Sequence, residues 1–168
     1  MQNKTGELTM KYHMRRIERE ITSIDKINSI IEQGKFATIA MCYQHSPYVI
    51  TLSYGYNRES QTLYFHSANS GKKVDILKAN PEICMTVIQD DGYIDGECGH
   101  SYKSVVIYGK MELIENDMEK RNGIEIIINH LESKPKMIID KFDTMKEKIK
   151  NTNVYKVKII KISGKEGR

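Results

Sequence analysis

The chain of 168 residues has no tryptophan and only three cysteines, three prolines and three phenylalanines. Its cysteines, Cys42, Cys84 and Cys98, are too few and too scattered to form a disulfide framework. Cys42 and Cys84 lie inside apolar, strand-like runs, so we expect them to be small buried residues. Cys42 and Cys98 each precede a histidine closely, but neither pair has the spacing of a known zinc site, and we predict no metal centre.

Long apolar runs and clustered charge are also missing. No apolar run approaches the roughly 20 residues that a transmembrane helix needs. Residues 1–13 are polar and lack the apolar core of a secretion signal, which predicts a flexible leader and a cytoplasmic protein. The net charge is +4, and the basic residues are spread along the chain rather than gathered in a stripe. We therefore expect no membrane or nucleic-acid partner and a single domain over residues 14–168.

Several motifs of well-known enzyme classes do not occur. The chain has no Gly-x-Gly-x-x-Gly stretch, which argues against a Rossmann dinucleotide site, and no Walker A loop. It also lacks the Gly-x-Ser-x-Gly and His-Glu-x-x-His patterns of α/β-hydrolases and zinc proteases. The sequence therefore does not indicate membership of any of these enzyme classes.

The hydrophobic pattern predicts a mostly β protein with peripheral helices. We expect strands at residues 36–42, 48–56, 62–66, 83–89 and 102–114, and a last strand in which Val154, Lys156 and Lys158 alternate with Tyr155, Val157 and Ile159. Helices are expected at residues 23–34, 72–79 and 117–131, with a short one near residues 144–150. So many strands with so few helices favour an antiparallel barrel or sandwich rather than alternating βαβ units.

One strand, turn and helix combine to form a candidate anion site. The strand at residues 62–66 is followed by a polar turn and by a helix that starts with Lys72 and Lys73. Backbone N–H groups at a helix start attract anions, and Gly71 lets a phosphate approach them closely. Two adjacent ammonium groups suit a phosphate monoester, and three side chains can donate or cap there: Ser67, Asn69 and Ser70. The alternative is an ordinary helix start with two solvated lysines.

Four segments in this order resemble a known family. They are residues 14–21 (MRRIEREI), the turn 66–73 (HSANSGKK), residues 102–110 (YKSVVIYGK) and residues 162–165 (ISGK). Together they resemble the nitroimidazole-resistance branch of the pyridoxamine 5′-phosphate oxidase-like superfamily. The resemblance covers roughly residues 14–168. It implies an antiparallel six-stranded split β-barrel that binds FMN, as a homodimer with the flavin at the subunit interface.

The resemblance also implies which residues hold the flavin. The FMN phosphate would be bound by Ser67, Gly71, Lys72 and Lys73, the same turn that the residues themselves mark as an anion site. The backbone of Val49, Ile50, Thr51 and Leu52 would run beside the polar edge of the ring. Ser104 matches a position where relatives place a polar side chain near the flavin. Its alternative is an ordinary strand hydroxyl that faces solvent.

His66 is the candidate catalytic residue, since the matching histidine in this branch lies beside the flavin and the substrate. A proton donor near neutral pH would suit nitro-group reduction. Its alternative is a histidine that packs on the cofactor or closes the turn. The other histidines, His13, His45, His100 and His130, have no partner that the sequence identifies. The tyrosines Tyr54, Tyr56, Tyr64 and Tyr102 lie on predicted strands in a pattern typical of barrel packing.

The resemblance implies an FMN-dependent reductase of a small organic acceptor, such as a nitroaromatic or 5-nitroimidazole, with reduced nicotinamide as the electron donor. True pyridoxamine phosphate oxidases carry a C-terminal segment rich in arginine, histidine and tryptophan. This chain has no tryptophan, so vitamin B6 oxidation is not expected. The alternative is a module that binds flavin or haem without turnover, with His66 as an axial ligand.

Overall fold

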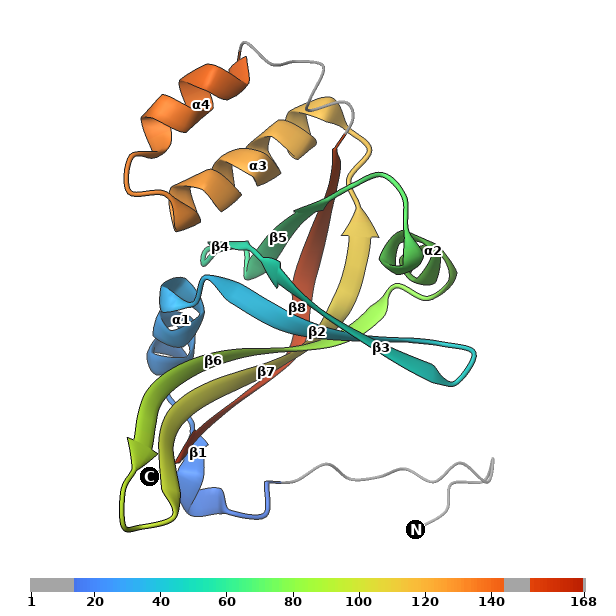
Figure 1. The fold of residues 1–168 in the computed structure, drawn as a ribbon. Coiled ribbons are helices and arrows are strands. Elements are labelled where there is room, and N and C mark those ends of the chain that lie inside the picture. Colours follow the sequence, from blue (N-terminus) through green and yellow to red (C-terminus); the bar gives the residue numbers. More distant parts are fainter. Residues whose placement is uncertain (1–13, 144–151, 168) are drawn as a thin grey trace.

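The computed structural model describes residues 14–143 and 152–167. The leader predicted at residues 1–13 and the short helix predicted near residues 144–150 lie outside the described residues. The described part of the chain forms an eight-stranded antiparallel sheet with helices packed around it (Figure 1). The expectation of a mostly β fold with peripheral helices is confirmed.

The elements follow one another in short steps. The strands are β1 (Glu20–Ile21), β2 (Phe36–Tyr43), β3 (Ser46–Ser53), β4 (Gly55–Asn57), β5 (Thr62–Ser67), β6 (Glu82–Ile94), β7 (Gly99–Leu113) and β8 (Asn153–Gly167). The helices are a short 3-10 turn (Ile17–Arg19), α1 (Ile24–Gln33), α2 (Lys72–Ala79), α3 (Asp117–Leu131) and α4 (Pro135–Asp143). Helix α4 was not predicted as a separate helix.

The strand order makes the sheet curl. The hydrogen-bonded path runs β3-β2-β6-β7-β8-β5-β4, with β1 added to β8. Strands β3 and β4 are thus the two ends of this path, yet only Tyr54 separates them in sequence. The sheet must bend until its two ends almost meet, which gives a barrel that is joined there by the chain and not by a ladder (Figure 1).

Strand β5 separates two hydrophobic clusters. Leu63 and Phe65 point into the barrel, where they pack with residues such as Ile39 and Ile107. Tyr64 points the other way, into a second cluster beneath α3. Because both faces of β5 are covered, this strand is an apolar run rather than an alternating one. It therefore leads into the α2 turn from a rigid, fully packed base.

Helices α1 and α3 close the barrel on the sides away from α2 (Figure 1). Helix α1 buries Ile27, Ile30 and Ile31, which repeat at the spacing of one helix face. Helix α3 crosses β4 so closely that a methyl group on Gly55 would lie 2.5 Å from the backbone nitrogen of Ile127. A glycine is required at that crossing.

The structure corrects three expectations. Cys42 is exposed and Cys84 only half-buried, because even-numbered positions on β2 and β6 face away from the barrel interior. The strand expected at residues 48–56 is divided at Tyr54, whose buried hydroxyl donates to the carbonyl of Ile31 at 2.6 Å. The short strands β1 and β4 add to the six strands expected. The alternation expected in the last strand is confirmed, with Tyr155 and Val157 in the barrel core.

Candidate functional site

The predicted anion site is a tight turn between β5 and α2. Strand β5 ends at Ser67, and α2 begins at Lys72 after the cap residue Gly71. Gly71 has φ of +116°, a backbone conformation that side-chain-bearing residues rarely adopt. A methyl group built on Gly71 would meet no atom of the described residues within 4 Å. The space over Gly71 at the start of α2 is therefore open to an incoming group.

Helix α2 begins differently from α1 and α3. The side chain of Ser23 accepts a hydrogen bond from the backbone N–H of Lys26 at the start of α1. The side-chain oxygen of Asn116 accepts one from the backbone N–H of Glu119 at the start of α3. At Gly71 there is no side-chain cap in the part of the chain that the structure describes. The first N–H groups of a helix have no partner inside the helix, so those of α2 are available to an external acceptor.

The two lysines of α2 face different neighbours. The ammonium of Lys72 lies over the ring of Tyr48, 4.6 Å from its centroid. Lys73 is half-buried, and its charge acts on His66. Consecutive helical residues point about 100° apart, which explains the divergence. The lysines therefore border the helix start from two sides rather than forming one pair.

Burial and the charge of Lys73 together lower the pKa of His66 below its usual value of 6.5. The residue sits near the end of β5, at the surface, opposite Val154 of β8. Both effects favour the neutral form of its imidazole. An anion at the start of α2 would offset the charge of Lys73 and raise the pKa of His66 again.

Ser67 is the buried member of the turn, with 8% of its surface exposed. Its hydroxyl donates to the backbone carbonyl of Ala68 at 2.8 Å. In this conformation the hydroxyl stabilises the turn through that hydrogen bond. Asn69 and Ser70 are exposed on the same turn.

The predicted flavin strand lies at an edge of the sheet. Among the described residues β3 pairs with β2 alone, so the backbone groups along its other side are not used in the sheet. Val49 and Thr51 point outward, and Val49 is 56% exposed, whereas Ile50 and Leu52 pack against the barrel core. A free strand edge is what backbone recognition of a ring requires.

Ser104 is not brought to this turn. It lies on β7, half-buried, opposite Ile88 of β6 and Lys165 of β8. His66 lies opposite Val154 of the same strand β8. Val154 and Lys165 are separated by roughly 35 Å along that strand at about 3.3 Å per residue. Within one chain, Ser104 and His66 belong to different ends of the molecule.

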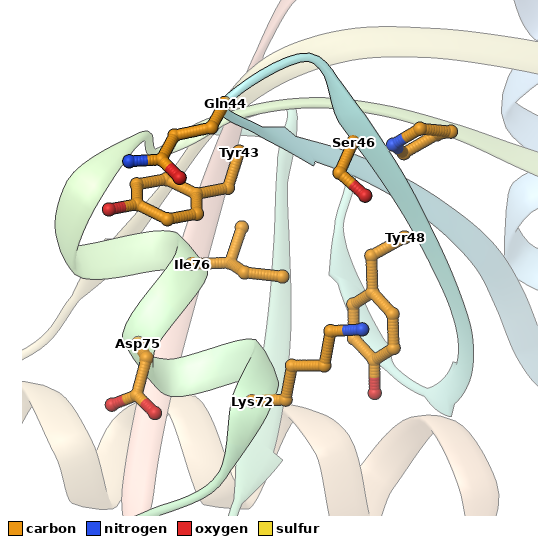
Figure 2. A pocket seen from close by; sticks show the side chains of 8 residues that line it. Tyr43, Gln44, Ser46, Tyr48, Lys72, Asp75 and Ile76 are labelled. Atoms are coloured by element: carbon orange, nitrogen blue, oxygen red, sulfur yellow. The ribbon is translucent and has the colours of Figure 1, made fainter.

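A groove beside the anion turn was not predicted. It lies between the β2–β3 hairpin and α2 and measures about 500 Å³ (Figure 2). Its lining consists of Tyr43, Gln44, Ser46, Pro47, Tyr48, Lys72, Asp75 and Ile76, and we refer to it as the hairpin–helix groove. Lys72 thus borders both the groove and the anion turn. Tyr48 and Lys72 lie 24 positions apart in the sequence, which explains why no local pattern revealed the groove.

Two histidines for which the sequence identified no partner have one in the structure. The ring nitrogen Nε2 of His130 lies 2.6 Å from the carbonyl oxygen of Gly34, and its ring packs against Tyr54 at 4.9 Å. His100 lies 2.7 Å from the carboxylate of Asp90 and lowers the pKa of that carboxyl. These contacts tie α3 to the start of β2 and brace the β6–β7 hairpin, respectively.

The expected barrel packing is confirmed for Tyr54 and Tyr56, whereas Tyr64 packs in the cluster beneath α3 and Tyr102 is half-buried. Tyr54, Tyr56 and Tyr64 are buried, and the hydroxyl of Tyr56 donates to Asn28 at 2.9 Å. Burial raises the pKa of Tyr56 and of Tyr64. These tyrosines are therefore structural phenols that stay protonated at neutral pH.

Two further features were searched for over residues 14–143 and 152–167. No group of three or more histidine, cysteine, aspartate or glutamate side chains there could hold a metal ion. None of the helices in these segments is long and apolar enough to cross a lipid bilayer.

Comparison with known proteins gives a family match over most of the chain. A family model described as pyridoxamine 5′-phosphate oxidase matches residues 23–166. Among solved structures, a candidate 5-nitroimidazole antibiotic resistance protein from Bacteroides thetaiotaomicron is 29% identical to this chain. That match covers 88% of this chain and 86% of the other, with a TM-score of 0.75.

More distant structures share the fold. A FAD-binding protein from Mesorhizobium loti is 20% identical, with 89% of this chain and 96% of that chain covered and a TM-score of 0.63. A FAD- and haem-binding protein from Mycobacterium smegmatis is 16% identical, with 89% and 74% covered and a TM-score of 0.71. No curated protein matches the chain.

Proposed function

The chain belongs to the pyridoxamine 5′-phosphate oxidase family, and from this premise we propose that it binds a flavin through the phosphate of its FMN portion. We propose further that it is a cytoplasmic reductase of a small organic acceptor. The observation that carries the proposal is the start of α2, which has a glycine cap, two lysines and no side-chain cap among the described residues.

The residues of this turn fit a flavin phosphate. Free N–H groups at a helix start bind phosphate oxygens, and the open space over Gly71 lets them approach. Lys73 supplies a half-buried positive charge at the same place, where an ammonium interacts with a phosphate more strongly than in open water. The free edge of β3 supplies the backbone donors and acceptors for the ring.

The flavin, when bound, supplies hydride transfer between a reduced nicotinamide donor and the acceptor. The protein holds the phosphate at α2 and presents the exposed side chains of Val49 and Thr51 along β3. We propose that His66 moves the proton. Burial and Lys73 lower the pKa of its imidazole, and a phosphate charge nearby would raise that pKa again, so that the ring takes up a proton more readily.

The proposed acceptor is a nitroaromatic compound such as a 5-nitroimidazole. Support comes from the 29% identity with the candidate resistance protein from Bacteroides thetaiotaomicron over most of both chains. Reduction of a nitro group needs a proton with each hydride, and His66, which directly precedes the turn and whose pKa responds to Lys73, is the residue that we propose supplies it.

We also propose that the protein acts as a homodimer. If Ser104 contacts the flavin, it must do so from a second copy, because within one chain it lies far along β8 from His66. The outer face of the sheet supports this assembly. Val49, Ala40, Cys84 and Tyr108 follow one another across β3, β2, β6 and β7 as a row. Both large side chains of this row, Val49 and Tyr108, are exposed, and exposed apolar patches of this kind mark interaction sites.

A second candidate function is a module that binds flavin or haem without turnover. The lowered pKa of His66 favours the neutral imidazole, which is the form that ligates haem iron. The fold is shared with a protein described as binding both FAD and haem. A Soret absorption band in the purified protein would decide for this candidate.

The test is a visible spectrum of the purified protein, followed by NADH or NADPH without oxygen and then by a 5-nitroimidazole. We expect flavin absorbance that bleaches with the donor and returns with the acceptor. Flavin absorbance that the donor leaves unchanged would contradict the reductase, and the absence of any flavin after FMN or FAD is supplied would contradict the flavin site.

Lys73→Ala tests the anchor, with Lys78→Ala in the last turn of α2 as its matched control. Loss of a charge-assisted hydrogen bond should weaken flavin binding by about tenfold or more. The control should leave the affinity unchanged, because the phosphate is placed at the opposite end of the helix. Equal affinities of both variants would show that Lys73 does not hold the phosphate.

A further inference from the structure

A second pocket lies on the side of the barrel away from the anion turn. It measures about 370 Å³, within the range of roughly 300–1,000 Å³ that small-molecule sites usually show. Helices α1 and α3 and strand β4 supply its walls, whereas α2 lies on another side of the barrel (Figure 1). We refer to it as the α1–α3 pocket, and its lining consists of Glu32, Tyr56, Asn57, Ile126, Asn129 and His130.

Hydrogen bonds within the protein already engage donors of three lining residues. Nε2 of His130 lies 2.6 Å from the carbonyl oxygen of Gly34, and since a carbonyl can only accept, this nitrogen carries a proton. The hydroxyl of Tyr56 donates to Asn28 at 2.9 Å. The side-chain amide of Asn129 donates at 2.9 Å to the backbone carbonyl one turn earlier in α3. Acceptors remain on all three side chains: the amide oxygen, the phenol oxygen and, in the neutral ring, Nδ1.

Glu32 adds a carboxylate with unused acceptor capacity to this lining. Its ion pair with Arg58 spans 3.7 Å, longer than a hydrogen bond, because Arg58 pairs more closely with Asp25. The charge of Glu32 acts on both titratable neighbours in the pocket. Burial raises the pKa of Tyr56 and Glu32 raises it further, whereas burial lowers the pKa of His130 and Glu32 opposes that change. Burial thus favours the neutral imidazole, whose Nδ1 has a free lone pair.

Two helices end at the pocket. Glu32 lies in the last turn of α1, and Asn129 and His130 lie in the last turn of α3. The C-terminus of a helix carries partial negative charge, which favours a cation. Lys35 shows this effect at the end of α3, where its ammonium donates to the carbonyl of His130 at 2.8 Å. Lys35 is not part of the lining, so Glu32 remains the charged side chain of the pocket.

A carboxylate, several acceptors and two helix C-termini suit a ligand that brings a positive charge and N–H donors. We propose that the α1–α3 pocket binds a small organic ammonium ion, with the ammonium at Glu32 and the apolar part of the ligand against Ile126. The side chain of Ile126 is partly buried at the edge of the cluster beneath α3, where it offers apolar surface. None of the lining residues belongs to the proposed flavin site, and the proposal does not depend on that site.

The test uses n-butylamine, which is charged at pH 7, and two analogues. n-Butanol has a similar shape without the charge, and tetramethylammonium has the charge without N–H donors. NMR titration of the wild-type protein at constant pH and ionic strength follows the imidazole signals. We expect butylammonium to shift the signals of His130 and to leave those of His66 and His100 unchanged. Both analogues should bind at least about tenfold more weakly, since hydrogen bonds between charged groups are lost.

Glu32→Gln shows whether the carboxylate holds the ligand. It keeps the shape of the side chain but removes its charge, and it should weaken the binding of butylammonium by about tenfold or more. Glu97→Gln is the matched control, because it changes the net charge equally at an exposed position between β6 and β7. The control should bind butylammonium as the wild-type protein does. Both variants should keep the wild-type affinity for flavin.

Three results would overturn the proposal. One is that butylammonium leaves the signals of His130 unchanged or shifts those of all three histidines equally. Another is that butanol binds as tightly as butylammonium, which would make the pocket an apolar site. The third is equal binding of butylammonium by Glu32→Gln and by the wild-type protein. Each of these results concerns the α1–α3 pocket alone and would leave the proposed flavin site intact.

Discussion

Helices α2 and α3 begin in opposite ways. Helix α3 starts with the side-chain cap of Asn116 and has Asp117 and Glu119 in its first turn, so its N-terminal N–H groups and its dipole are satisfied from within. Helix α2 starts with Gly71, has Lys72 and Lys73 as well as the acidic Asp75 in its first turn, and lacks a side-chain cap among the described residues. Lysines at a helix start oppose the dipole, each by a few tenths of a kcal/mol.

The difference separates a helix start that is satisfied from within from the helix start at which we propose that an anion binds. The start of α3 needs nothing further, and the helix packs over β4 and β5 as part of the core. The start of α2 has no side-chain cap among the described residues, so under the proposed function an anion that binds there would stabilise it. The predictions below test this contrast, beginning with the largest expected effect.

Giving α2 the acidic start of α3 should have the largest effect. Gly71→Asp places a carboxylate at the proposed phosphate position, and like charges at close range repel strongly in partly buried sites. We expect flavin affinity to fall by about 100-fold. Titration of the flavin-free protein with FMN and FAD measures the change.

Gly71→Asn is the control for this variant. It carries a similar backbone strain at φ of +116°, about 1–3 kcal/mol, and a similar volume, but no charge. The Asn variant should bind flavin at least about tenfold more tightly than the Asp variant. Equal affinities of the two variants would mean that shape, and not charge, controls access to the turn.

Removing the cap of α3 should affect stability alone. Asn116→Ala deletes the acceptor for the N–H of Glu119 and should lower the free energy of unfolding by about 1 kcal/mol. Ser23→Ala at α1 should act in the same way. Urea unfolding followed by circular dichroism measures both changes. Flavin affinity should stay at the wild-type value, and a loss of binding in Asn116→Ala would contradict the division of roles between the helices.

The titration of two histidines, His66 beside the start of α2 and His130 on α3, tests the same contrast between the two helices. The pKa values of His66 and His130 are both lowered, chiefly by burial. A phosphate at α2 should raise the pKa of His66 and leave that of His130, which is bound to Gly34 at the other side of the barrel, unchanged. NMR titration of the imidazole signals with and without flavin measures this. Equal shifts of both histidines, or none, would contradict the proposed phosphate position.

The smallest expected effect is a pH dependence of stability. Because both histidines have native pKa values below 6.5, the unfolded state takes up protons first as the pH falls. The stability that they contribute is complete above pH 6.5 and is lost as the pH decreases through their native values. His130→Gln should flatten the decrease in unfolding free energy between pH 7 and 5. If the unfolding free energy of this variant decreases with pH as steeply as that of the wild-type protein, other groups cause the pH dependence.

Local signals predicted the framework of the proposed site. The apolar run of β5, the glycine at position 71 and the two lysines that follow it lie within a dozen residues, so their arrangement depends on short-range geometry. The same holds for Asn116 and Ser23, which act on residues three positions away. Caps and turns form from neighbours in sequence, and for this reason they can be read without the fold.

Partners that lie far apart in sequence could not be found in this way. His130 was expected to lack a partner, yet it contacts Gly34, which the chain brings near only when α3 packs across the barrel. Cys42 and Cys84 lie in apolar runs but face outward, because the side of a strand that becomes buried depends on what covers the sheet. Burial on one face or the other is a property of packing and not of composition.

The sequence by itself determined a helix start with a glycine and two lysines at Gly71–Lys73 and a mostly β chain, because backbone conformation, charge and strand alternation are properties of neighbouring residues. Only the tertiary structure decided that Lys72 leaves this pair to cover Tyr48, that a groove opens beside it, and that Ser104 lies at the other end of β8. These relations depend on how the sheet curls, and the curl is set by contacts between strands that are distant in sequence.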